Sequence, residues 1–120
     1  MAIITLKSLN FIDISLDSVT NIDLINDLVS LGLLKNAPNG LRVQKIVFIP
    51  SQIGDSIVVR DTQGGPRIFS AINTLGDYDI LKDDYYDRDG KTKGKIMSPY
   101  IDSSESVIGI PNNAYLIFEL

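Results

Sequence analysis

The chain has 120 residues, of which 44% are hydrophobic and 22% are charged, and its formal net charge at pH 7 is −4. It contains no histidine and no cysteine, which excludes Ser-His-Asp and Cys-His catalysis, the usual zinc sites and disulfide bonds. The acidic balance argues against nucleic-acid binding, and no stretch reaches the roughly 20 apolar residues that cross a bilayer. We therefore expect one soluble domain over residues 1–120, made in the cytoplasm, with no cofactor, metal site or enzymatic activity.

The first part of the chain is predicted to hold two strands and one helix. A short apolar strand begins near the N-terminus, and residues 11–16 alternate apolar with polar side chains, the period of a half-buried strand. A short amphipathic helix is expected near residues 21–31. Thr20 and Asp23 have the spacing of a capping box, and Gly32 is placed to end the helix.

From Leu41 onward the sequence is typical of strands. Residues 61–65 form a Gly-rich turn signal, and strands of about five residues separated by turns about every 8–12 residues indicate an antiparallel sandwich or barrel. The predicted fold is a mainly β, antiparallel β-sandwich, jelly-roll-like, with one short helix. The last strand is long and apolar, so it must be held in a sheet. The expected strands are 41–43, 45–49, 56–60, 67–72, 106–110 and 114–120.

Between residues 72 and 106 the strand pattern breaks. Six aspartates crowd into residues 77–89 together with three tyrosines, and three lysines follow at alternate positions. A loop this long in a compact domain is usually functional or mobile, so it is the predicted contact surface. A Pro-Tyr-Ile segment at 99–101 offers an apolar surface with a polar rim, or else a tucked-in loop anchor. The candidate interface residues are Tyr78, Tyr85, Tyr86, Tyr100 and Ile101.

Two chemical interpretations of the acidic segment compete with a simpler one, a solvated hairpin that turns at residues 88–91. An EF-hand alignment on Gly90 places Tyr85 at the first ligand position and Ile96 at the bidentate acid, so that motif fails, although another calcium loop stays open. A glycosidase pair of carboxylates is disfavoured, because the chain has no tryptophan and solvated carboxylates rarely acquire shifted pKa values.

The blocks at residues 45–69 and 111–119 together show one characteristic order of strands and turns. A strand is followed by Gly-Asp, a strand ending in Asp, a Gly turn and an apolar return strand, and a late apolar strand closes the domain. This pattern resembles the small β-sandwich structural proteins of tailed-bacteriophage virions. The resemblance implies a non-enzymatic capsid decoration or head-associated protein. Such a protein would be located in the virion and would bind the major capsid protein, another virion protein or its own copies.

A second function remains open from the residues themselves. Tyr78, Tyr85 and Tyr86, with the carboxylates near them, would suit a small carbohydrate- or ligand-binding β-sandwich module, with or without calcium. The two functions differ in the expected partner, because one needs a protein surface and the other a small molecule.

Overall fold

The computed structural model describes residues 2–8, 10–16, 21–35, 39–51, 53–73, 81–108 and 114–120. These residues form eleven strands, one α-helix and one 3-10 helix. The strands are β1 (Ala2–Ser8), β2 (Phe11–Leu16), β3 (Ile22–Asp23), β4 (Leu41–Val43), β5 (Lys45–Ile49), β6 (Ser56–Asp61), β7 (Arg67–Ile72), β8 (Leu81–Asp84), β9 (Lys95–Met97), β10 (Pro99–Ile101) and β11 (Ala114–Glu119), and the helices are α1 (Leu24–Ser30) and η1 (Ser103–Glu105).

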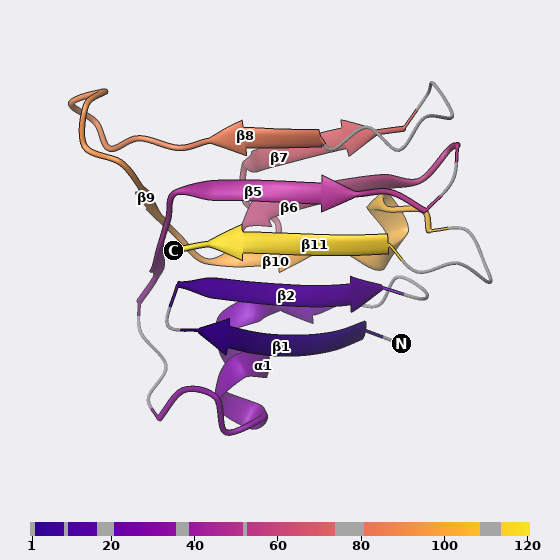
Figure 1. Ribbon diagram of the computed structural model, residues 1–120, viewed down its shortest axis with the longest axis horizontal. Helices are drawn as coiled ribbons and strands as arrows, with labels where there is room; N and C mark the ends of the chain where they lie inside the picture. Colours follow the sequence, from indigo (N-terminus) through magenta and orange to yellow (C-terminus); the bar gives the residue numbers. More distant parts are fainter. Residues whose placement is uncertain are drawn as a thin grey trace.

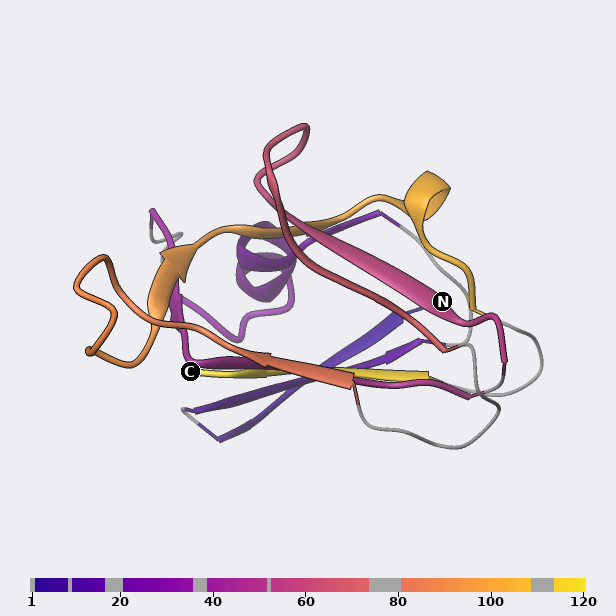
Figure 2. The same ribbon diagram turned by 90° about the horizontal axis from the view of Figure 1, so that it is seen from above.

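Two antiparallel sheets form the layers of a sandwich. Sheet A has the strand order β1-β2-β11-β5-β8, and sheet B has the order β3-β10-β6-β7 (Figure 1). The short strands β4 and β9 pair with each other as a separate ribbon. Figure 2 shows the two layers edge-on with α1 between them, and Figure 1 shows α1 beside β1 at the edge of sheet A. The predicted mainly β, antiparallel sandwich with one α-helix is therefore confirmed.

The core lies between the sheets and follows the period-two pattern of the strands. In sheet A, Ile12, Phe118 and Ile46 are cross-strand neighbours, and they are at most 1% exposed. The next buried row is Ile14, Leu116 and Phe48. Sheet B contributes Ile57, Val59 and Ile101 to the same cluster, and β9 contributes Met97. Each fully buried side chain of this size contributes about 1.5–3 kcal/mol of hydrophobic stabilisation.

The helix is shorter than the sequence predicted. It begins at Leu24, because Ile22 and Asp23 form β3 and pair with Ile101 and Tyr100 of β10. Asp23 occupies the N-cap position without a side-chain cap hydrogen bond, and Thr20 lies outside the described residues. Tertiary pairing thus draws into sheet B two residues that local signals assigned to a helix. Gly32 follows the helix with φ +76°, as expected of a C-terminal stop signal.

The region after β10 also differs from the prediction. A strand was expected over residues 106–110, but Ser106, Val107 and Ile108 form no strand, and 109–110 lie outside the described residues. Val107 makes one isolated antiparallel bridge with Ser56. The expectation for the last strand is confirmed, because β11 is hydrogen-bonded on both sides, to β2 and to β5.

Hydrogen bonds of polar side chains at the two ends of β6 hold the neighbouring loops against this strand. At its start, buried Asp55 accepts hydrogen bonds at Oδ2 from the backbone N–H (2.6 Å) and hydroxyl (2.5 Å) of Ser51. At its other end, the guanidinium of Arg60 donates two hydrogen bonds to Glu105, at 2.8 and 2.7 Å. These hydrogen bonds hold the pKa of the Glu105 carboxyl below its usual value. Arg60 also donates to the Gly65 carbonyl at 2.7 Å, so one side chain ties both the Gly turn and η1 to the sheet.

Candidate functional site

The five predicted interface residues do not form one surface in the structure. Tyr100 and Ile101 lie in β10 and are only 7% and 1% exposed, which corrects their assignment to a contact surface. They are the tucked-in anchor that the sequence left as the alternative, because pairing of β10 with β3 and β6 draws them inside. Tyr78 lies outside the described residues. Tyr85 is half-buried, and Tyr86 is 46% exposed.

Tyr85 and Tyr86 begin a projecting hairpin, which we call the arm and define as residues 85–96. It leaves sheet A after β8, extends beyond the end of the sandwich and returns through β9 (Figure 1). The predicted hairpin is confirmed, and its turn comes one residue earlier than expected: the Gly90 N–H donates to the Asp87 carbonyl at 2.9 Å. Gly90 adopts φ +70°, a conformation that glycine reaches at little cost.

The base of the arm is fixed by hydrogen bonds to β7 of sheet B and to the segment that includes β4 and Gln44. The Tyr85 hydroxyl donates to the carbonyl of Ile68 in β7 at 2.6 Å, and burial raises the pKa of this phenol, so it stays protonated. The Tyr85 N–H donates to the Gln44 carbonyl at 2.9 Å, and the Gly94 N–H donates to the Tyr85 carbonyl at 2.8 Å. Arg42 donates to the Gly94 carbonyl at 3.1 Å. The arm therefore has a defined direction relative to the sandwich.

The tip of the arm is organised by Asp89. Its Oδ1 accepts the backbone N–H groups of Lys91 (2.8 Å) and Thr92 (2.9 Å), and its Oδ2 accepts the Thr92 hydroxyl (2.7 Å). These donors lower the pKa of Asp89 to about 2, with the Thr92 N–H as the largest cause. At neutral pH the carboxylate is charged and holds the turn in one shape without burial of apolar side chains.

One side of the arm presents apolar and basic groups together. Tyr86 and Ile96 are 46% and 61% exposed, and with Asp87, Arg88 and Lys95 they line a hollow of about 530 Å³. We call Tyr86, Arg88, Lys95 and Ile96 the arm patch. Aromatic residues and arginine are enriched at protein–protein interfaces, where a few of them carry most of the binding energy. This surface has the composition of a protein-binding patch.

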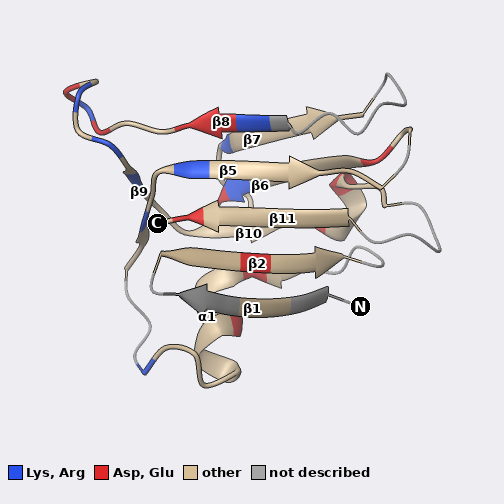
Figure 3. Cartoon of the chain, in the orientation of Figure 1, with Lys and Arg blue, Asp and Glu red and all other residues tan. Residues whose placement is uncertain are grey.

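The arm differs in charge from the rest of the chain. It holds four basic and two acidic residues, so its net charge is +2, whereas the remaining residues carry −6 of the total of −4. Figure 3 shows the basic residues along the arm and β9. The three alternating lysines, Lys91, Lys93 and Lys95, all belong to it. The sequence identified the acidic run but did not show that the basic residues after it would form a separate projection.

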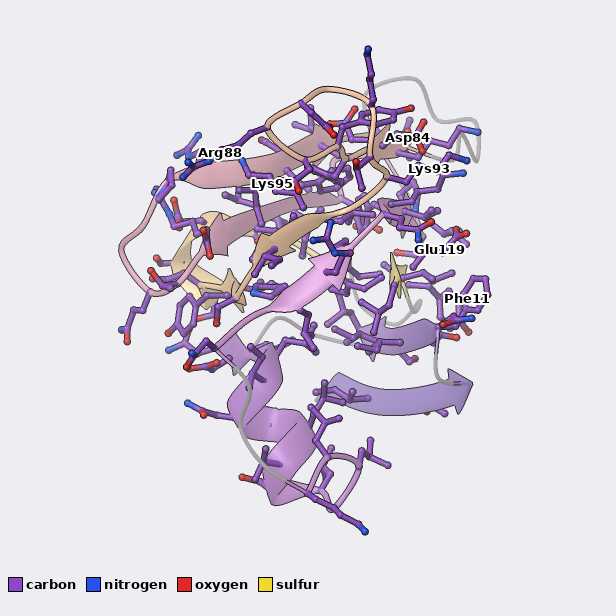
Figure 4. All side chains as sticks on the ribbon, turned by 90° about the vertical axis from the view of Figure 1, so that its left-hand side faces the viewer. Phe11, Asp84, Arg88, Lys93, Lys95 and Glu119 are labelled. Atoms are coloured by element: carbon purple, nitrogen blue, oxygen red, sulfur yellow. The ribbon has the colours of Figure 1, made fainter. Side chains whose placement is uncertain are left out.

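A row of side chains on the outer face of sheet A completes the candidate site. Phe11, Glu119, Lys45 and Asp84 are successive cross-strand neighbours on β2, β11, β5 and β8. Figure 4 shows Phe11, Glu119, Lys93 and Asp84 on one side of the molecule and Arg88 and Lys95 on the other. Lys45 Nζ lies 3.7 Å from Asp84 Oδ1, while Phe11 is 43% exposed. Sequence reasoning missed Phe11, Lys45 and Glu119.

The described residues contain no group of three or more aspartate or glutamate side chains placed to hold a metal ion. Asp89, the best candidate ligand of the acidic segment, uses both carboxylate oxygens within its own turn. Asp87 lies 3.9 Å from Arg42.

In the part of the chain that the structure describes, no helix has the length and apolar composition of a membrane span. The chain has no significant match among protein families, curated proteins or solved structures.

Proposed function

We propose that this chain is a non-enzymatic structural protein that attaches to other protein subunits through its arm. The observation that carries the proposal is the arm patch, in which exposed Tyr86 and Ile96 lie beside Arg88 and Lys95 on a rigidly anchored hairpin. A surface that is already ordered before binding loses less conformational entropy when a partner docks.

The charge distribution favours binding of the arm to partners with an acidic surface, and further copies of the same chain have such a surface. The arm carries +2 and the remainder of the chain −6, so the arm of one copy is attracted to the body of another. An arm-to-body contact joins two different surfaces, and such contacts generate rings or open arrays. Repeated copies on a lattice would multiply a modest affinity through multivalency. This is the assembly behaviour expected of a virion decoration or head-associated protein, the role that the sequence pattern implies.

Self-association is tested by light scattering over a range of protein concentrations and salt. We expect a discrete oligomer at low salt that dissociates as the Debye length falls from about 10 Å at 0.1 M to about 3 Å at 1 M. The double variant Arg88→Glu/Lys95→Glu should be monomeric. Its matched control, Lys35→Glu/Lys82→Glu, changes the net charge equally outside the arm and should still assemble.

Attachment to a virion is tested by co-sedimentation of the purified protein with tailed-phage capsids. The wild-type protein and the control variant should sediment with the capsids, and the arm variant should stay in solution. A wild-type protein that is monomeric at every concentration and does not sediment with capsids would contradict the proposed function.

A further inference from the structure

A cleft of about 240 Å³ lies where the outer row of sheet A meets the arm. Its volume is slightly below the range of about 300–1,000 Å³ that is usual for drug-sized ligands. Its size therefore matches a ligand of one small ring. The cleft is lined by Gln44, Lys45, Asp84, Tyr85, Tyr86, Lys93 and Glu119. It shares only Tyr86 with the arm patch.

The walls of the cleft are held in place by backbone pairing. Lys45 lies directly opposite Glu119 on one side and Asp84 on the other. The Gln44 N–H donates to the Glu119 carbonyl at 2.7 Å, and Tyr86 forms an antiparallel bridge with Lys93. Three parts of the chain that are distant in sequence, residues 44–45, residues 84–93 and Glu119, thus present their polar side chains in one place, which favours binding of a small ligand.

Two of the charged groups in the cleft are available to a ligand. Lys45 is 3.7 Å from Asp84, but within the described residues the side chains of Lys93 and Glu119 make no hydrogen bond or ion pair. The Lys93 ammonium group offers three hydrogen-bond donors, and the Glu119 carboxylate offers two acceptor oxygens. They lie beside the exposed ring of Tyr86.

The balance of charges selects the class of ligand. Two lysines and two carboxylates give the cleft a net charge of zero. A phosphate would face Asp84 and Glu119, and a metal cation would face two ammonium groups. A hydroxyl group both donates and accepts, so adjacent hydroxyls can bridge an ammonium donor and a carboxylate acceptor. The Tyr86 ring supplies the apolar face that orients such a ligand.

We propose that this cleft binds one neutral sugar ring. The Tyr86 side chain packs against the C–H face of the sugar. The sugar hydroxyls accept a hydrogen bond from the Lys93 ammonium group and donate one to the Glu119 carboxylate. This site goes beyond the proposed function, because it takes a small molecule and needs neither Arg88 nor Lys95.

The site is tested by nuclear magnetic resonance titration of the full chain with glucose, galactose, mannose and N-acetylglucosamine. At least one sugar should give saturable shifts at Tyr86, Lys93 and Glu119, with a millimolar Kd. Glu119→Gln and Tyr86→Ala should each weaken binding about tenfold, as expected when one hydrogen-bond partner or the stacking face is lost. Tyr115→Ala should leave the Kd unchanged, because Tyr115 lies on the same sheet face but does not line the cleft.

Two results would overturn the sugar site: no saturable shift at the cleft with any of the four sugars, or tighter binding of glycine or inorganic phosphate, which would make the ligand charged. The spectra of the free variants show whether each is folded. Arg88→Glu/Lys95→Glu should keep the wild-type Kd for sugar while losing assembly, so a failure of the sugar site and a failure of the proposed function give different results.

Discussion

The core between the sheets and the arm are stabilised in opposite ways. In the core, rows such as Ile14, Leu116 and Phe48 are completely buried, and close packing fixes their positions. In the arm, Tyr86 and residues 87–93 are exposed, and hydrogen bonds to backbone groups fix the shape. The core should therefore respond to changes of side-chain volume, and the arm to loss of single donors or acceptors. Because the exposed side chains of the arm are not needed for packing, their identities can serve binding instead of stability.

The largest expected effect tests the core side of this comparison. Phe48→Ala should lower the free energy of unfolding by about 3–5 kcal/mol, because it leaves a cavity in the centre of the sandwich. Arg88→Ala, at the arm tip, should change it by less than about 0.5 kcal/mol. Equilibrium urea unfolding measures both. Similar losses in the two variants would show that the arm is part of the cooperative core.

An intermediate effect is expected where the arm meets sheet B. Tyr85→Phe keeps the half-buried ring but removes the hydroxyl that donates to the Ile68 carbonyl, which should cost about 0.5–1.5 kcal/mol. Amide hydrogen exchange should become faster at Gly94, because its N–H donates a hydrogen bond to the Tyr85 carbonyl. Tyr86→Phe is the matched control, since its side chain is exposed. Unchanged exchange at Gly94 in Tyr85→Phe would mean that the hydroxyl does not anchor the arm.

The smallest effect concerns the pH dependence of the arm tip. The pKa of Asp89 is lowered from 3.8 to about 2, so its charged form favours the folded turn. This contribution is fully present above about pH 4 and is lost as the pH falls toward 2. The Asp89 carboxyl carbon resonance should therefore titrate near pH 2. In Thr92→Val, which loses the hydroxyl donor, the midpoint should move upward; a wild-type midpoint near 3.8 would contradict the turn.

The sequence predicted the strands whose two faces differ in environment. Residues 11–16, 45–49 and 114–119 were found because burial of one face imposes period-two alternation. The short strands β3, β8, β9 and β10 were not predicted, because each forms by pairing with a strand far away in the chain.

The candidate site was predictable only in part. An extended backbone turns Tyr85 and Tyr86 to opposite sides, but which one is buried depends on the position of β7. The alternation in β11 places Glu119 on the outer face. Its position beside Lys45 and near Asp84, however, depends on the register of three strands separated by long stretches of sequence.

β11 is the last strand in chain order, yet it lies in the middle of sheet A, between β2 and β5. After β5 ends, the 65 residues from Pro50 to Ala114 must be synthesised before the shared partner of these two strands begins to form. At about 5–20 residues per second, this delay lasts about 3–13 s on the ribosome. During that time β2 and β5 lack their shared partner, and their free edges and apolar faces can pair with other nascent chains.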